Sequence, residues 1–234
     1  MNVGSEGLIQ LGVWEVHPQT LKATGVAWED VVAGRIPKEI NGHLPPKAGK
    51  DFPSMGWRVV DTRIEPWSDE VLILGAPSTA ELGRWVLTQL ARGDDGWYFA
   101  SPMNCLPVPS REHRRQGLRL QWAQERFTRS RQHPRPLDVV LSNDSDTPWF
   151  PTELDTEHVQ GVVFNNAGQR LGTGWFAHGQ AERLPELHPG QRLTLPVVWE
   201  NEVFEKLAIG QYQIAAHLVA LNLRTGAEAG LTIS

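Results

Sequence analysis

Hydrophobic and polar residues alternate along most of the second half of the chain. Leu118, Leu120 and Trp122 alternate with arginine and glutamine, as expected for a strand with one buried face. Six similar runs follow, separated by turn residues. The seven predicted strands cover 118–122, 137–141, 158–164, 169–176, 193–199, 212–218 and 230–233. This series predicts an antiparallel β-sandwich over residues 117–234.

The first half of the chain predicts a small α+β domain over residues 1–102. Leu21, Trp28 and Val31 fall near one face at helical spacing, with Thr20 at the N-cap position, so we expect one amphipathic helix at 20–35. Strand patterns follow, and the Gly and Asp residues between the last two are typical of a hairpin turn. These predicted strands cover 57–64, 70–74, 84–90 and 96–100.

A proline-rich segment separates the two halves. Pro102, Pro107 and Pro109 lie close together, and each proline removes a backbone donor and disfavours both helix and central strand. We therefore predict a linker at 103–116. The chain as a whole is then mainly β, with a small α+β N-terminal domain before an immunoglobulin-like β-sandwich.

Composition supports a globular protein, with 40% hydrophobic and 21% charged residues. No run of 18 apolar residues occurs, so we expect no membrane span. The N-terminus lacks the pattern of a signal peptide, which favours the cytoplasm and leaves the cell envelope open if a signal peptide was removed. The single cysteine, Cys105, excludes an internal disulfide and zinc sites built from several cysteines.

Charge is unevenly distributed along the chain. The net charge is −5, which argues against general affinity for nucleic acid. Residues 111–135, however, contain eight arginines and two glutamates. The first four of these arginines form a candidate basic patch: Arg111, Arg114, Arg115 and Arg119. We expect a solvated linker and a charged edge strand, with phosphate binding to a nucleic acid as the alternative.

Candidate chemistry is sparse, and we predict neither a metal site nor a cofactor. Asp155, Glu157 and His158 lie close in sequence, but alternate residues of a strand point to opposite faces, which favours a polar start of a strand over a metal or acid/base site. The acidic run 143–146 lacks the Gly and the distal Glu of a calcium loop, which favours a turn. Cys105 has no local nucleophile signature, and familiar catalytic motifs are absent from the sequence. We expect a non-enzymatic protein.

Four segments of the second half carry a family resemblance: LDVVLSNDSDTPW, HVQGVVFNNAGQRL, LHPGQRLTLPVVWE and LAIGQYQIAAHL. Together they resemble the BsuPI-type intracellular proteinase-inhibitor family. That family combines a Pro-Gly turn, a Trp near the end of the next strand and a Gly-x-Tyr that opens another strand. The matching residues are Pro189, Gly190, Trp199, Gly210 and Tyr212. In immunoglobulin-type sandwiches this tyrosine turns its hydroxyl to an upstream backbone group, and Ile214 takes the inward position of a cysteine. The resemblance implies inhibition of a protease.

The first half resembles the cone-shaped nuclear-transport-factor-2-like family. The resemblance covers residues 20–101 and rests on a helix followed by an antiparallel sheet with a DDGW hairpin. It implies a concave sheet that holds a small ligand against Trp57, Trp85 and Trp97. The alternative is that these three tryptophans belong to the core.

Aromatic residues in the loops of the predicted sandwich are the candidate partner-binding surface, because loops at the ends of this architecture carry recognition. They are Trp149, Phe150, Trp175, Phe176 and Phe204. The alternative is that they fill the ends of the core. We expect a protein-binding or assembly module with a protein partner, and homo-oligomer formation stays open. The alternative functions are a ligand-binding or enzymatic N-terminal domain and nucleic-acid binding through residues 111–135.

Overall fold

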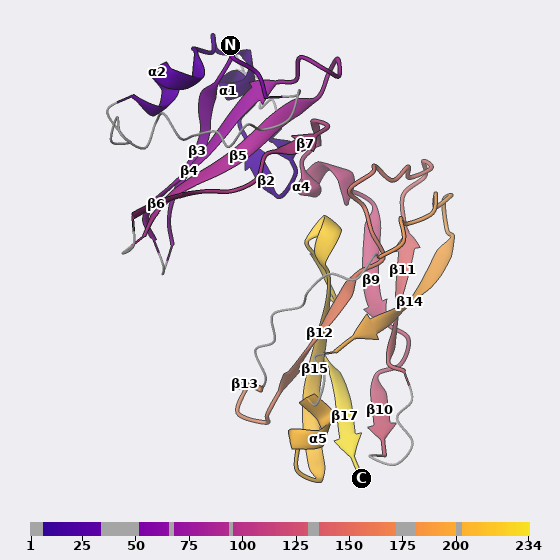
Figure 1. Cartoon of the computed structure of the whole chain (residues 1–234). Helices are drawn as coiled ribbons and strands as arrows, with labels where there is room; N and C mark the ends of the chain where they lie inside the picture. Colours follow the sequence, from indigo (N-terminus) through magenta and orange to yellow (C-terminus); the bar gives the residue numbers. More distant parts are fainter. Residues whose placement is uncertain are drawn as a thin grey trace, which may run out of the picture. The chain divides into compact units, whose positions relative to one another are not determined.

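In the computed structural model of the chain, contacts divide the residues into two compact units, Met1–Ser110 and Arg111–Ser234. We call them the N-terminal and the C-terminal unit. The structure describes residues 7–33, 52–65, 68–93, 96–130, 136–171, 181–199 and 203–234, without the side chains of 65, 69, 93, 96 and 97. Strands dominate (Figure 1), which confirms the mainly β class. No helix in the described ranges is long and apolar enough to cross a membrane.

The N-terminal unit is built on an antiparallel sheet of order β3-β4-β5-β6, with β7 also paired to β5. A second sheet has the order β2-β1-β8. The strands are β1 (Ile9–Leu11), β2 (Trp14–Val16), β3 (Arg58–Glu65), β4 (Ser68–Pro77), β5 (Trp85–Gly93), β6 (Gly96–Phe99), β7 (Met103–Cys105) and β8 (Val108–Pro109). Strands β3 to β6 lie close to the positions predicted from the sequence.

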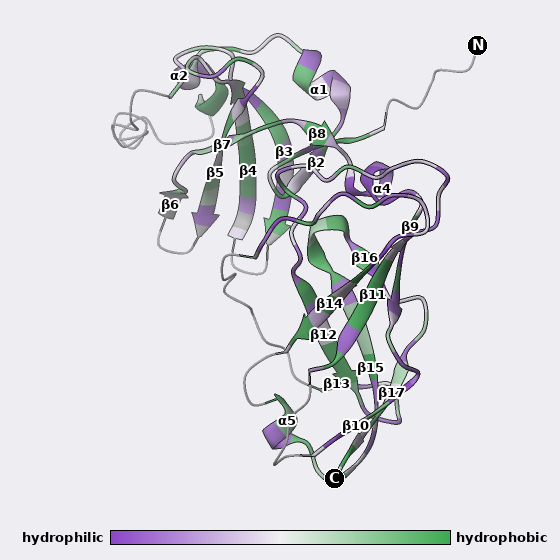
Figure 2. Cartoon of the chain, turned by 90° about the vertical axis from the view of Figure 1, so that its right-hand side faces the viewer, coloured by the Kyte–Doolittle hydropathy of each residue, from purple (hydrophilic) through white to green (hydrophobic). Residues whose placement is uncertain are grey.

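Both faces of the larger sheet are buried. Along β4, Val71 and Ile73 belong to one hydrophobic cluster, and Leu72 and Leu74 belong to another, because successive side chains of a strand point to opposite faces. This double burial explains why β4 reads as a nearly continuous hydrophobic run (Figure 2).

The predicted single helix at 20–35 is wrong. The structure has two short helices, α1 (Pro18–Lys22) and α2 (Trp28–Val32). Helix α1 begins before Thr20, because the Nδ1 atom of His17 caps it by accepting a hydrogen bond from the second helical residue.

An interaction with a distant segment separates the two helices. The backbone N of Val26 donates to the carbonyl of Trp57, and the N of Trp57 donates to the carbonyl of Val26, both at 2.9 Å. Beside this bridge, Gly25 lies so near Gly56 that a Cβ atom would be 2.2 Å from its backbone. The chain is therefore held extended at the point where the sequence pattern continues a helix.

Regular structure also replaces the predicted linker at 103–116. Strand β7 pairs with β5, and β8 pairs with β1. Helix α4 (Arg111–Arg114) then begins the C-terminal unit. The prolines exclude a long strand or helix, but they allow short edge strands, in which a missing donor costs little.

The C-terminal unit is a β-sandwich made from one ladder, β10-β17-β15-β12-β14-β11-β9. The strands are β9 (Leu118–Trp122), β10 (Arg126–Arg129), β11 (Asp138–Asn143), β12 (Val159–Phe164), β13 (Arg170–Leu171), β14 (Arg192–Val198), β15 (Gly210–Leu218), β16 (Leu223–Arg224) and β17 (Ala229–Ile233), with α5 (Val203–Lys206) and the 3-10 helix η1 (Val219–Leu221). Strands β12 and β14 share only a short parallel contact. The ladder divides there into two sheets, β9-β11-β14 and β10-β17-β15-β12 (Figure 1).

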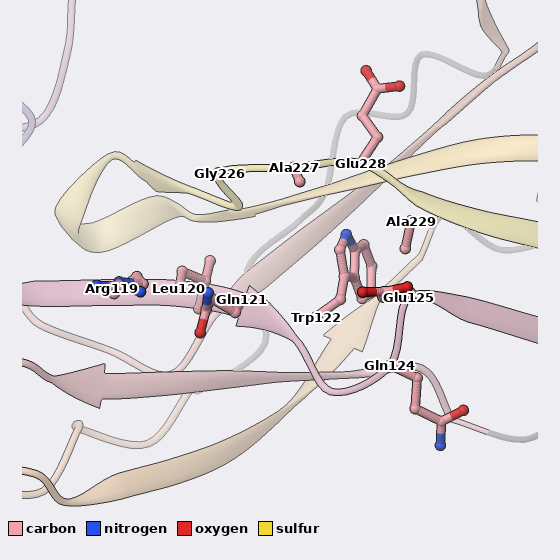
Figure 3. A pocket seen from close by; sticks show the side chains of 10 residues that line it. All are labelled: Arg119, Leu120, Gln121, Trp122, Gln124, Glu125, Gly226, Ala227, Glu228 and Ala229. Atoms are coloured by element: carbon pink, nitrogen blue, oxygen red, sulfur yellow. The ribbon is translucent and has the colours of Figure 1, made fainter.

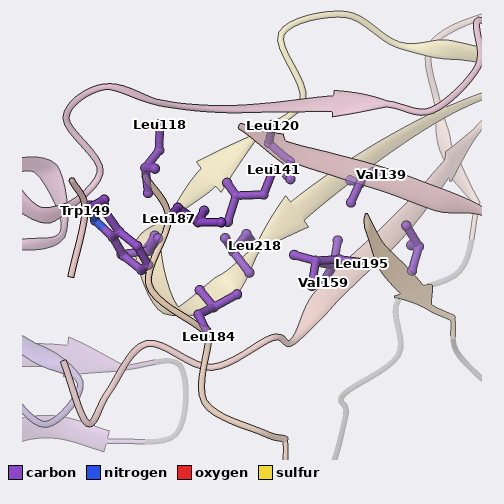
Figure 4. Packing of buried hydrophobic residues seen from close by; sticks show 13 residues of the cluster. Leu118, Leu120, Val139, Leu141, Trp149, Val159, Leu184, Leu187, Leu195 and Leu218 are labelled. Carbon is purple, nitrogen blue, oxygen red and sulfur yellow. The ribbon is translucent and has the colours of Figure 1, made fainter. Parts of the chain in front are cut away.

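The two sheets share a core. Leu120 and Leu141 come from the first sheet, and Val159 and Leu218 from the second, yet all four lie in one buried cluster (Figure 4). The sheets therefore pack face to face, as the sequence predicts for a β-sandwich. Strand β10 was not predicted; it lies in the arginine-rich segment and pairs in parallel with β17.

Several scaffold features of the sandwich are confirmed. The Tyr212 hydroxyl donates to the carbonyl of Ala208 at 2.9 Å, and Ile214 is fully buried. The turn after Pro189 is closed by Gly190, which has a φ of 74° and donates its N–H to the carbonyl of Asn143 at 2.8 Å. A left-handed φ of this kind favours glycine.

Trp199 lies at the boundary between the two hydrophobic clusters that form the core of the sandwich. Its ring stacks on Trp122 with the centroids 6.5 Å apart and the planes 12° apart, and both rings pack against both core clusters of this unit. A Cβ atom on Gly161 of β12 would lie 2.4 Å from the Trp199 ring. Glycine at this position therefore lets the indole lie directly on the strand.

The contact between Gly161 and Trp199 leads to a stability prediction. Gly161→Ala should lower the free energy of unfolding by about 1 to 3 kcal/mol, because the new methyl group overlaps a packed ring. Gly230→Ala is the matched control, since its Cβ would meet its nearest neighbour, Arg126, at an ordinary 3.7 Å. Urea denaturation followed by tryptophan fluorescence measures both. Equal effects of the two substitutions would contradict the proposed role of the contact.

Candidate binding groove at strand β9

Strand β9 leads directly into a crossing between the two sheets of the sandwich. It ends at Trp122, and β10 begins at Arg126 in the opposite sheet. The carbonyl of Glu125 accepts a hydrogen bond from the N–H of Gly230 at 2.9 Å, which fixes the crossing against β17. The chain thus passes from one sheet to the other between β9 and β10.

The outer edge of β9 presents open backbone groups. Ala123 donates its N–H to the carbonyl of Asp138 at 3.1 Å, so its peptide groups face β11. Every second residue of an antiparallel pair does the same, and Leu120 and Trp122 belong to the other set. The N–H and C=O groups of these two residues therefore point away from β11. Because β9 is the last strand of the described ladder, no strand of this ladder pairs with them.

A groove of about 360 Å³ opens along this edge (Figure 3). Residues 119–122 and 124–125 form one wall, and residues 226–229 form the other. At about 30 Å³ for each water molecule, the groove has the space of roughly a dozen. That is room for a few side chains.

The second wall of the groove is a bulge. Arg224 of β16 lies opposite His217, and Ala229 of β17 lies opposite Ile214. The stretch 225–228 therefore faces only residues 215–216 of the partner strand. Extra residues of this kind bend a strand out of its sheet.

The charged residues of the groove differ in their partners. Arg119 forms an ion pair with Asp144, with 2.7 Å between Nε and Oδ2. Glu125 has no ion-pair partner among the residues that the structure describes. Glu125 lines the groove together with Trp122, whereas the side chain of Glu228 points away from Trp122 (Figure 3).

Trp149, a predicted partner-binding residue, lies in the core of the unit. Its side chain is 8% exposed and belongs to the core cluster (Figure 4). The Nε1 atom of its indole donates to the carbonyl of Arg114 at 2.6 Å, so both the apolar ring and its polar atom are satisfied inside the unit. The neighbouring Phe150 is 66% exposed.

Phe204, another predicted partner-binding residue, packs against the second core cluster of the unit. Phe204 packs edge-on against Trp199, with centroids 4.9 Å apart, and the Arg129 guanidinium lies 3.9 Å above its ring. Trp175 and Phe176 lie outside the described residues.

Arg114, one of the predicted basic-patch residues, is buried in an ion pair and is not part of a surface patch. Its Nε and Nη2 atoms donate to Oδ1 of Asp155 at 3.2 and 3.0 Å, and the two side chains are 4% and 0% exposed. The other carboxylate oxygen accepts from the N and the hydroxyl of Thr152 at 2.8 and 2.7 Å. Both carboxylate oxygens of Asp155 thus accept hydrogen bonds from structural partners. This supports a structural role for Asp155 over a metal or acid/base site with Glu157 and His158.

The other predicted basic residues have different surroundings. Arg115 donates to the carbonyl of Asn222, Arg119 pairs with Asp144, and Arg111 is half-buried. Arg114, Arg115 and Arg119 therefore hold partners within the C-terminal unit. Residues 131 and 135 lie outside the described ranges.

The acidic run 143–146 forms a turn, as predicted. Asn143 is fully buried, and its Nδ2 atom donates to the carbonyls of Thr147 and Leu187, both at 2.8 Å. Its Oδ1 atom accepts from the N–H of Ser145 at 3.0 Å. No group of three or more His, Cys, Asp or Glu side chains in the described ranges is arranged to hold a metal ion.

The pocket predicted between Trp57, Trp85 and Trp97 is not formed by the first two. Trp57 and Trp85 belong to the clusters on opposite faces of the N-terminal sheet. The Nε1 atom of Trp57 donates to the carbonyl of Pro53 at 2.6 Å, which supports a role in the core. The structure does not describe the side chain of Trp97.

Comparison with known proteins does not assign the chain to a family. The sequence matches none of the protein-family models and none of the curated proteins. Protease inhibition and the two family resemblances therefore stay predictions.

The ion pair between Arg114 and Asp155 gives a second stability prediction. Arg114→Met should lower the free energy of unfolding by about 3 to 5 kcal/mol, because it leaves a buried carboxylate without its cation. Adding Asp155→Leu should restore part of this loss, since the unpaired charge is then removed. Urea denaturation of the single and double variants tests this. A double variant no more stable than Arg114→Met would show that the loss has another origin.

Proposed function

We propose that this protein is a protein-binding module whose C-terminal sandwich takes up an extended segment of a partner at the open edge of β9. The observation that carries the proposal is the groove of about 360 Å³ beside the outward peptide groups of Leu120 and Trp122. An extended segment placed along this edge adds a strand to the sheet β9-β11-β14.

Strand addition suits the chemistry of the edge. Backbone hydrogen bonds supply affinity in this mode of recognition, and side chains at alternate positions supply specificity. Leu120 and Trp122 provide two N–H and two C=O groups spaced for such a ladder. The side chains that point from the added strand toward the sandwich then enter the groove.

The architecture supports the specificity that strand addition requires. One wall is fixed by the pairing of β9 with β11. The other is fixed by the hydrogen bond from Gly230 to Glu125 and by the pairing of β17 with β15. A site with rigid walls binds with a smaller entropic cost than a site that must be ordered by its ligand.

Filling the groove should abolish binding. Ala227 is exposed on the second wall, and Ala227→Trp places an indole in the space that a bound segment needs. Peptides selected on the full-length protein from a random display library should bind this variant at least about tenfold more weakly by fluorescence anisotropy. Ala167→Trp is the control, because Ala167 is equally exposed in the turn before β13.

Hydrogen exchange tests the mode of binding. The amides of residues 120 and 122 should exchange more slowly with a selected peptide bound, because they gain acceptors. If the selected peptides bind the Ala227→Trp and Ala167→Trp variants equally well, or if these two amides keep their exchange rates, the proposed function is wrong.

A further inference from the structure

Two carboxylates line the groove, those of Glu125 and Glu228, and neither is paired with a cation in the part of the unit that the structure describes. Glu125 is exposed. The cation of the groove, Arg119, is held by Asp144 at 2.7 Å. The charge left for a ligand is therefore negative, and Glu125 lies at the end of the groove where β9 crosses to β10.

Glu125 shares the groove with an aromatic ring that is held in place. Trp122 lines the groove, stacks on Trp199 and packs against Phe127 with the centroids 5.4 Å apart and the ring planes at 66°. Among aromatic side chains, tryptophan attracts a cation most strongly, because its ring has the largest quadrupole. The ring and the carboxylate, which line the same groove, thus attract the same kind of group.

The backbone fixes the position of this carboxylate. The carbonyl of Glu125 is bound by the N–H of Gly230 at 2.9 Å, and Arg126, the next residue, pairs with the same glycine in the ladder of β10 and β17. The acidic side chain therefore begins from a rigid point, as a specificity site requires. Glu125, Trp122 and Ala229 all line the same groove (Figure 3).

We infer that the extended segment bound at β9 carries a lysine or arginine whose cationic group contacts Trp122 and pairs with Glu125. This inference rests on the proposed function and adds the chemical class of the partner segment. The hydrogen bond between such a cation and the carboxylate is charge-assisted and stronger than a neutral one. A segment with an acidic residue at this position is repelled by Glu125.

The peptides selected on the full-length protein provide the probe. The expected result is that they share a Lys or Arg, and that replacing it with Gln weakens binding to the wild-type protein about fivefold or more. Glu125→Gln should remove this difference between the Lys and Gln peptides. Glu228→Gln is the matched control and should keep it, because the Glu228 side chain points away from Trp122 (Figure 3). Thermal unfolding of both variants shows that the fold is intact.

The outcomes separate this inference from the function on which it rests. Peptides that lose affinity with Ala227→Trp but bind equally well with Lys or Gln would overturn the inference and leave the proposed function standing. The same holds if Glu228→Gln acts as strongly as Glu125→Gln. Peptides that bind the wild-type protein and the Ala227→Trp variant equally would overturn both.

Discussion

The stacked pair of Trp122 and Trp199 holds the core of the C-terminal unit together. Each ring packs against both hydrophobic clusters of the sandwich, so the two clusters depend on one aromatic contact. The indole of Trp199 reaches this place because Gly161 has no Cβ beneath it. In the absence of a disulfide in this unit, such packing supplies what a covalent bridge between the sheets supplies in antibody domains.

The proposed binding groove follows from this arrangement. Trp122 ends β9 in one sheet, and Phe127 of β10 packs into the second cluster on the other. The chain must cross between them, and the last strand bulges at the same level. Neither strand covers the outer edge of β9 there. Trp122 therefore has two roles. Its ring packs in the core of the sandwich, and it ends β9 at the point where the outer edge of this strand is uncovered.

The candidate site was mostly beyond the reach of sequence reasoning. Trp149 beside Phe150 predicted a recognition loop, but the carbonyl of Arg114 accepts the indole N–H of Trp149 and draws its ring into the core. The arginine-rich segment predicted a charged surface, yet Arg114 meets Asp155 from 41 residues away. The alternation at 118–122 predicted β9, but the sequence analysis held no prediction of β10, in which the chain continues in the opposite sheet.

Local patterns predicted most strands of the sandwich, the turn at Pro189 and Gly190 and the corner at Tyr212, because alternation and turn chemistry depend on neighbouring residues. They missed the short strands β10 and β16. Only the tertiary structure decided where β9 ends as an open edge and which charges are neutralised. It also decided that the helix expected at 20–35 breaks at the bridge between Val26 and Trp57. These outcomes depend on contacts between residues far apart in the chain, and no local pattern of hydrophobic and polar positions records such contacts.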